Sequence, residues 1–308
     1  MTFGVTLGLD ATSTFILVAL AGVVPLAILG WVLLLAIGAL YRARAISDQS
    51  IMIDSVWLMF ALIDALALAS EGTIWLLAPL GAFVLYKIVA LIGFALIRPR
   101  ADRPAPKLLL LRVFSLGKRS ATLFDQFAKL WRHTGPIRMI AGPDLATTTI
   151  EPHEFLNFVG GRLSRRFIAN AETLDQRLAE TAGGAEFDGR YRVGDLYCHD
   201  DTWTMALARL VEESDAVLMD LRGFTPANKG CTFEIAELIN LAPLSRVVFV
   251  TDKTTDETFL RATINEAWAH AAAASPNREG QAQARIFDLE GAARVPDLIR
   301  HVAAASAA

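Results

Sequence analysis

The chain contains only two cysteines, Cys198 and Cys231, among its 308 residues. Two cysteines cannot form the disulfide framework of a small secreted domain, so we expect a reducing compartment. Metal binding is also disfavoured, because no Cys-x-x-Cys or His-x-x-Glu-His spacing is present. In His199-Asp200-Asp201, beside Cys198, adjacent side chains cannot all face one ion. We expect Asp200 or Asp201 to cap the following helix instead.

The sequence has no stripe of basic residues interleaved with aromatic ones, which excludes a typical nucleic-acid-binding surface. Its 29 Lys and Arg residues and 32 Asp and Glu residues give a net charge of −3. This near balance hides an uneven distribution. Arginines flank the apolar segments of the N-terminal part, whereas charges of both signs are mixed in the remainder.

Long stretches without charge dominate the N-terminal part. A hydrophobic content of 54% and a mean hydropathy of +0.41 are too high for an ordinary soluble protein. Phe15–Leu40 is an uncharged apolar run, and about 20 residues are enough to cross a bilayer as a helix. It is too long for a signal-peptide core and no basic region precedes it, so we predict a retained anchor. Glu71-Gly72-Thr73 divides the next apolar block into Ile51–Ser70 and Ile74–Ile97.

Arginine groups predict the orientation of these segments. One group lies in Tyr41-Arg42-Ala43-Arg44, after the first span, and the other lies in Arg98–Arg103, after the last. The positive-inside rule places both in the cytoplasm, which requires two spans between them. We therefore predict an integral protein of the inner or plasma membrane with its N-terminus outside and its C-terminal domain cytoplasmic. Residues 1–97 form the transmembrane region, with spans at about 15–40, 51–70 and 74–97.

The middle span carries two carboxylates, Asp54 and Asp64. Residues 51–70 therefore either cross the bilayer or lie at its interface. In a hairpin that turns at Gly72, Asp54 and Lys87 come within about one helical turn of the same depth. An ionisable group inside a membrane is a functional candidate by default. A structural ion pair is the equal alternative, and one such pair does not make a transport path, so a transporter or channel is disfavoured.

A proline-rich charged linker, residues 98–107, leads into a C-terminal region, 108–308, with a different pattern. Apolar runs such as Leu108–Phe114 are typical of strands buried in a parallel sheet, and they alternate with segments of helical spacing. This alternation predicts an α/β domain with a doubly wound parallel sheet. The predicted strands are 108–114, 137–141, 191–197, 216–219, 246–251 and 285–289, and the predicted helices are 122–133, 154–167, 171–181, 201–213, 256–274, 292–304 and one that begins near Gly230.

The stretch Ala216–Leu238 joins an apolar strand to an amphipathic helix through a loop rich in Gly, Pro and Asn. Ligands of parallel α/β sheets bind outside the carboxyl ends of the strands, where such loops converge. Glu234 is expected in the first turn of the helix, where the macrodipole favours an ionised carboxylate. The residues expected at this edge of the sheet are Asp220, Arg222, Asn228, Cys231 and Glu234.

Several of these residues also have an interpretation without function. A carboxylate is favoured near a helix start in any protein. Arg222 either clamps a phosphate or neutralises Asp220. Cys231 is a candidate for a lowered pKa and a nucleophilic role, but no histidine is near it in the motif, so a Cys–His hydrolase is disfavoured. Gly117-Lys118-Arg119-Ser120 either holds a phosphate or forms a solvated basic loop, and it lacks the Walker A spacing.

The central stretch resembles the TIR domain, in which a strand and a polar loop are followed by Cys-x-x-Glu at the start of a helix. Here the motif is Cys231-Thr232-Phe233-Glu234, and Gly230 stands where a tryptophan often precedes the cysteine. Arg112-Val113-Phe114-Ser115 resembles the Phe-x-Ser opening of a TIR domain, and Ser214-Asp215-Ala216-Val217 resembles its Ser-Asp-x-Val segment.

The same residues are similar to the nucleoside 2-deoxyribosyltransferases, whose signature is Gly-Thr-x-x-Glu-hydrophobic-Gly-x-Ala. Cys231 replaces the threonine, and Ala236 and Leu238 replace the final Gly and Ala. Both families share a flavodoxin-like fold, and in their active members the glutamate acts on an N-glycosidic bond. A carboxylate suits this chemistry because it stabilises a ribosyl cation or captures it covalently.

The resemblance implies that Glu234 is catalytic and that NAD or a related nucleotide is the substrate, with no cofactor and no metal. It also implies that Asp220 contacts ribose hydroxyls and that Phe114 or Trp203 stacks on a base. The candidate substrate-binding residues are Phe114, Ser115, Asp220, Arg222, Trp203 and Cys231.

Three functions remain open from the sequence. The first is a membrane-anchored NAD glycohydrolase or nucleoside deoxyribosyltransferase-like enzyme, the second a non-catalytic TIR-like signalling or scaffold domain, and the third a sensor that binds a nucleotide without cleaving it. An anchor confines the domain to two dimensions and raises its effective concentration for self-association. The resemblance to TIR domains, whose active sites are often completed by neighbouring copies, implies a homo-oligomer. The other expected partners are the lipid bilayer and a nucleotide-type small molecule.

Overall fold

The computed structural model describes residues 11–97, 104–112, 118–141, 167–181, 184–199, 201–278, 283–291 and 294–307. Its N-terminal part consists of three long apolar helices, α2 (Ala11–Arg42), α3 (Asp48–Leu68) and α4 (Ala78–Ile97). Three segments are long and apolar enough to cross a membrane, and their side chains lie almost entirely on the outside of the molecule. These segments are Val23–Arg42, Asp48–Leu68 and Ala78–Leu96.

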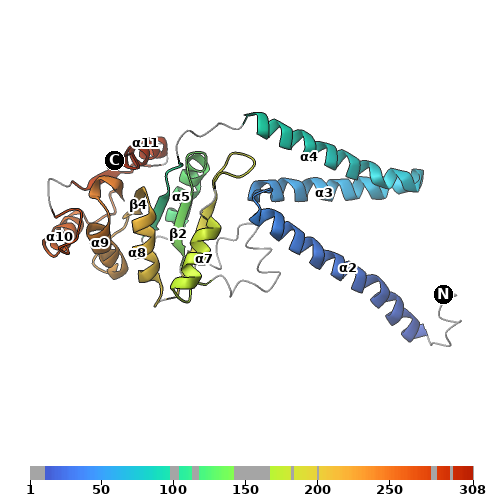
Figure 1. Ribbon diagram of the computed structural model, residues 1–308, viewed down its shortest axis with the longest axis horizontal. Coiled ribbons are helices and arrows are strands. Elements are labelled where there is room, and N and C mark those ends of the chain that lie inside the picture. The colour runs from blue at the N-terminus through green and yellow to red at the C-terminus, as the bar shows by residue number, and fades with distance from the viewer. Residues whose placement is uncertain are drawn as a thin grey trace.

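The helices α3 and α4 form a hairpin, as the sequence predicts. The chain turns through two short 3₁₀ helices, η1 (Ala69–Glu71) and η2 (Thr73–Leu77), with Gly72 between them at a φ of 138°. A residue with a side chain rarely adopts this φ, so glycine suits the turn. Trp57 of α3 stacks on Tyr86 of α4, with ring centroids 5.9 Å apart. Helix α2 runs away from this hairpin (Figure 1).

The C-terminal part is a six-stranded parallel sheet flanked by helices. Its strands are β1 (Leu108–Arg112), β2 (Ile137–Ala141), β3 (Val193–Tyr197), β4 (Ala216–Asp220), β5 (Val247–Thr251) and β6 (Arg285–Asp288). All neighbouring strands pair in parallel, in the order β3-β2-β1-β4-β5-β6. The predicted α/β parallel sheet is therefore confirmed.

Helices cover both faces of the sheet, and alternate strand residues pack against the two layers. One face carries α7 (Ala171–Thr181), α8 (Trp203–Glu213), α9 (Lys229–Leu241) and α10 (Glu257–Ala269), and the other carries α5 (Lys118–Trp131) and α11 (Val295–Ala305). The central strands β1, β4 and β5 are thus buried on both faces of the sheet, which explains the continuous apolar runs in the sequence.

Most predicted elements are present, with shifted ends. The predicted helix 122–133 begins at Lys118 and the predicted strand 191–197 begins at Val193. The helix predicted from about Gly230 begins at Lys229. Residues 154–166 of the predicted helix 154–167 lie outside the described residues. The short connection 244–246 between α9 and β5 forms a 3₁₀ turn, η6 (Leu244–Arg246).

The strand order creates a switch point between β1 and β4. From β1 the chain moves outward to β2 and β3, then returns to the other side of β1 and continues through β4, β5 and β6. Arg112 and Asp220 end the two central strands and lie opposite each other in register. In open parallel sheets the ligand crevice forms at such a switch point, outside the carboxyl ends of the strands.

Candidate functional site

The loop between β4 and α9 lies at this switch point. Gly223 turns the chain with a φ of 69°, a conformation that favours glycine. The side-chain carbonyl of Asn228 then accepts hydrogen bonds from the backbone N–H of Thr225 at 2.9 Å and from its hydroxyl at 3.1 Å. Asn228 therefore ties the end of the loop to its middle, and α9 begins at the next residue.

Glu234 lies in the second turn of α9, because the helix begins at Lys229. Its side chain is only 2% exposed. Its Oε2 atom has no hydrogen-bond partner among the residues that the structure describes. An incompletely paired carboxyl group is costly to bury in its ionised form.

The protonation of Glu234 follows from this environment. Burial raises the pKa of its carboxyl group to about 8, although a hydrogen bond from Cys231 acts in the opposite direction. The expectation of an ionised first-turn carboxylate is therefore wrong. The helix macrodipole acts within the first turn, and one turn further along the desolvation of the carboxylate has the larger effect.

Cys231 also lies beneath the switch point. Its Sγ atom is 3.9 Å from the carbonyl oxygen of Arg112, the last residue of β1, and its side chain is buried. Burial raises the pKa of the thiol, and the neighbouring Glu234 and Asp220 add to this effect. A lowered pKa and a nucleophilic role for Cys231 are therefore not supported, because a thiolate is unfavourable here.

Asp220 and Arg222 form a buried ion pair at the end of β4. The guanidinium group donates through Nε to Oδ1 and through Nη2 to Oδ2 of Asp220, each at 2.8 Å, and the backbone N–H of Arg222 also donates to Oδ1. Burial lowers the pKa of Arg222, but the hydrogen bonds and charge of Asp220, together with Asp252, leave it raised overall. Of the two roles considered for Arg222, the structure shows the one that neutralises Asp220.

Aromatic side chains flank the site from α8 and α9. Trp203, the first residue of α8, packs edge-to-face on Phe233, with ring centroids 5.3 Å apart. Phe233 precedes Glu234 and is 39% exposed. An aromatic residue exposed beside a buried carboxyl group is a candidate for contact with a ligand. The sequence contains Phe233 within the Cys-x-x-Glu motif, but nothing in the motif distinguishes it from a core residue.

The structure does not describe every residue that the sequence predicts for the site. Phe114, Ser115 and Gly117 lie outside the described residues, and α5 begins at Lys118. Among the described residues, no group of three or more His, Cys, Asp and Glu side chains could hold a metal ion.

The sequence predicts the wrong N-cap residue for α8. Thr202, rather than Asp200 or Asp201, stands at the N-cap. Its hydroxyl accepts a hydrogen bond from the backbone N–H of His199 and donates to the carbonyl oxygen of Ile168. The side chain of Thr202 therefore joins the loop before α8 to the segment before α7, rather than capping its own helix.

No family model, no curated protein and no solved structure matches this chain.

Proposed function

We propose that the C-terminal part is a TIR-like domain of the flavodoxin-like class that cleaves the N-glycosidic bond of NAD or a related nucleotide, and that Glu234 is its essential carboxyl group. The observation that carries this proposal is the position of Glu234. A buried, incompletely hydrogen-bonded carboxyl group with a raised pKa lies beside the switch point of a parallel α/β sheet. Titratable groups perturbed in this way are concentrated at functional sites.

The strand order supports a doubly wound sheet with a ligand crevice at the switch point. Without the edge strand β3, the remaining strands follow the order β2-β1-β4-β5-β6. This partial order corresponds to the 2-1-3-4-5 order of flavodoxin-like domains, whereas the complete order of the six strands is the 3-2-1-4-5-6 order of Rossmann folds. In both classes ligands bind at the switch point beside the first strand. On the flavodoxin-like interpretation β3 is an extra strand added to the outer edge.

The chemistry depends on the charge of the substrate. The nicotinamide ring of NAD is a cation, so its approach to Glu234 favours the carboxylate and lowers the pKa of this residue. When the bond between C1′ and the ring nitrogen breaks, its electron pair leaves with neutral nicotinamide, and no proton is needed on the leaving group. The Glu234 carboxylate then stabilises the ribosyl cation or captures it covalently. Water attacks C1′ and gives up a proton.

A second candidate function is a non-catalytic TIR-like signalling or nucleotide-sensing domain. It is favoured by the closed state of the site, since Glu234 is almost completely buried and Asp220 is paired with Arg222. Substrate reaches Glu234 only if the loops around the switch point move apart. If a ligand binds at this edge of the sheet and the loops stay closed, it does not contact Glu234 and is not cleaved.

We further infer that α2, α3 and α4 anchor the domain in a membrane, with the N-terminus outside and the domain cytoplasmic. The support is the length and composition of the three helices and the arginines that follow the first and last of them. Self-association within the membrane plane extends this proposal. A cysteine introduced at Gln49, at the start of α3, is expected to react with impermeant reagents only from the cytoplasmic side. Labelling from outside would overturn the orientation.

The enzymatic proposal is tested with the full-length protein reconstituted in lipid nanodiscs and incubated with NAD. Release of nicotinamide is followed by chromatography. We expect turnover by the wild type, none by Glu234→Gln, and unchanged turnover by Glu237→Gln, which alters a carboxylate on the same helix. Equal activity of the wild type and Glu234→Gln would remove Glu234 from the mechanism. Binding without turnover would favour the sensor, and the absence of both would favour the scaffold.

A further inference from the structure

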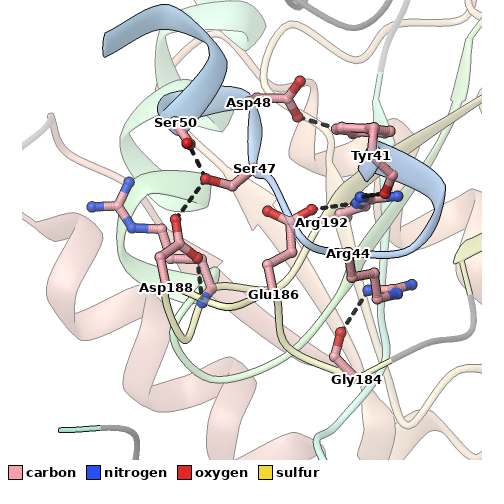
Figure 2. A network of polar contacts seen from close by, with 10 residues as sticks. Tyr41, Arg44, Ser47, Asp48, Ser50, Gly184, Glu186, Asp188 and Arg192 are labelled. Carbon is pink, nitrogen blue, oxygen red and sulfur yellow. Dashed lines mark hydrogen bonds and ion pairs between the residues drawn. The ribbon is translucent and has the colours of Figure 1, made fainter. Parts of the chain in front are cut away.

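Two segments that are about 140 residues apart in the sequence contact each other where the α3–α4 hairpin meets the α/β domain (Figure 2). One, called the connector below, is residues 41–50, which comprise the end of α2, the turn 43–47 and the start of α3. The other is the loop 184–192, which leads into β3. The Nη1 atom of Arg44 donates to the carbonyl oxygen of Gly184 at 2.5 Å. The hydroxyl of Ser47 donates to Oδ2 of Asp188 at 2.8 Å.

Arg192 contacts both segments of this interface. Its guanidinium carbon lies 3.6 Å from the centre of the Tyr41 ring, and its Nη2 atom donates to the carbonyl oxygen of Tyr41. Its Nε atom donates to Glu186 within the loop. The Tyr41 hydroxyl in turn donates to Asp48 at the start of α3. A planar guanidinium group can stack and donate in this way simultaneously, whereas an ammonium group cannot.

Burial affects the charged groups of the interface. The pKa of Glu186 is raised by burial, even though the hydrogen bond and charge of Arg192 act against this, and Asp48 and Asp188 add to it. The pKa of Arg44 is lowered by burial and by the charge of Arg192. The interface is therefore partly dehydrated, and its polar contacts are stronger than they are at an open surface.

The loop also reaches the side of the hairpin through Phe187. Its ring packs edge-to-face on Phe94 of α4, with centroids 5.5 Å apart. The Nζ atom of Lys87, also on α4, lies 5.8 Å from the centre of the same ring. Phe187 therefore connects the α/β domain with the charged residue of α4.

Lys87 is paired with Asp54 of α3, as their similar depth in the hairpin predicts. The Nζ–Oδ2 distance is 2.6 Å. Ser50 joins this pair, because its hydroxyl donates to Oδ2 of Asp54 at 2.9 Å and accepts from Lys87 at 3.0 Å. The backbone N–H of Ser50 donates to the Ser47 hydroxyl, which donates to Asp188 of the loop. Ser50 therefore contacts the ion pair through its hydroxyl and Ser47 through its backbone N–H, so a series of contacting residues runs from the ion pair to the α/β domain.

We propose that the Lys87–Asp54 pair and the loop 184–192 form one coupled latch, in which the ion pair between α3 and α4 holds the α/β domain docked against the connector. Loss of the Asp54 charge weakens the acceptor of the Ser50 hydrogen bond and removes the ionic partner of Lys87, whose Nζ atom lies near the Phe187 ring. Both changes reach the loop, one through Ser47 and the other through Phe187. A change in how α3 and α4 pack is therefore transmitted to the orientation of the domain.

This proposal is independent of catalysis by Glu234, and its test uses no substrate. Spin labels on cysteines introduced at Gln49 of α3 and Glu172 of α7 report the orientation of the domain by pulsed electron paramagnetic resonance in nanodiscs. Both positions are exposed, and the native cysteines are buried. We expect one narrow distance distribution for the labelled parent protein. A broad distribution for the parent would overturn a fixed docking.

Three variants in the labelled protein test the latch. Arg192→Ala and Asp54→Asn are expected to lose the narrow peak. Asp64→Asn removes a carboxylate of α3 that lies outside the latch, and it is expected to keep the narrow peak. If Arg192→Ala keeps the parent distribution, the loop is not a latch. If Asp54→Asn does so while Arg192→Ala does not, the ion pair is not coupled to docking.

A charge exchange distinguishes loss of coupling from misfolding. Asp54→Lys combined with Lys87→Asp restores opposite charges across the hairpin. We expect this double variant to recover the narrow peak that Asp54→Asn loses. A broad distribution in the double variant, with circular dichroism equal to that of the parent, would contradict a latch that depends on the ion pair.

Discussion

Cys231 lies one turn before Glu234 on α9, and its thiol hydrogen bonds to the Glu234 carboxyl group in a site where both side chains are buried. This contact lowers the pKa of Glu234, but burial raises it by more. The pair therefore resides beneath the switch point as a thiol and a carboxylic acid. Ionisation of either group requires a change in its surroundings, such as the arrival of a cationic ligand or of water.

The first prediction concerns the pH dependence of stability. The pKa of Glu234 is raised from a reference value of 4.5 to about 8 on folding. The stability that the bound proton supplies is fully present below the lower value and is lost as the pH rises through the upper one. We expect the wild type to lose stability relative to Glu234→Gln by up to about 1.4 kcal/mol for each pH unit between the two values.

The measurement is the thermal midpoint of the wild type, Glu234→Gln and Glu237→Gln over this range of pH. The curves of the wild type and Glu234→Gln should diverge as the pH increases, and the curve of Glu237→Gln should follow the wild type. Parallel curves for all three proteins would show that the carboxyl group of Glu234 is ionised throughout, contrary to its burial.

The second prediction concerns thiol reactivity. Both cysteines are buried, and burial raises the pKa of Cys198 to about 12 and also raises the pKa of Cys231. Thiolates are the reactive species, so we expect neither residue to be alkylated by a maleimide at neutral pH in the folded protein. Mass spectrometry of the modified peptides, with the denatured protein as control, checks this. Rapid modification of Cys231 alone would indicate that the site is open without ligand.

The third prediction concerns the ion pair at the end of β4. Asp220→Ala removes the carboxylate that faces the guanidinium group of Arg222 in a buried position. Removal of one partner of a buried pair typically costs about 3–5 kcal/mol, whereas replacement of both by apolar residues costs much less. We expect Asp220→Ala to unfold at clearly lower denaturant concentration than Asp220→Leu combined with Arg222→Met. If the double variant is the less stable one, this prediction fails.

Much of the architecture could be predicted from local patterns. The hairpin turn at Gly72 and the closeness of Asp54 and Lys87 follow from the length of the apolar runs and the rise of a helix. The sheet follows from the alternation of apolar runs with helical spacing, because this pattern records which side chains are buried. The strand order could not be derived from that pattern, since each strand buries both faces wherever it lies in the sheet.

The candidate site was predicted less completely, for two physical reasons. The position of Glu234 at the edge of the sheet was expected, but Glu234 is the sixth residue of α9, which places it in the second turn, and its side chain lies in the core. Its protonation then depends on burial, which motifs do not report. The docking of the loop 184–192 on the connector 41–50 depends on tertiary contacts between residues such as Arg192 and Tyr41. The sequence indicates only a membrane-interface position for Tyr41, and Arg192 does not stand out in it.

The last prediction links the protonation of Glu234 to the proposed substrate. Because Glu234 holds its proton at neutral pH in the free protein, binding of a cationic nicotinamide ring beside it is expected to release that proton. ADP-ribose lacks the cation and should bind without this release. To separate binding from hydrolysis, a carbocyclic NAD analogue that keeps the cationic ring but cannot be cleaved replaces NAD. Isothermal titration calorimetry in two buffers with different ionisation enthalpies then measures the number of protons released on binding. Binding is compared in the wild type and Glu234→Gln at neutral pH.

Proton release with this analogue is expected in the wild type and in Glu237→Gln, and not in Glu234→Gln. The expected value approaches one proton per analogue bound, since the carboxyl group is nearly fully protonated beforehand and nearly fully ionised afterwards. If the analogue binds to the wild type with no buffer dependence of the enthalpy, the cationic ring does not approach Glu234. The nucleotide would then occupy the edge of the sheet in a position that leaves the carboxyl group buried and protonated, as a sensor requires.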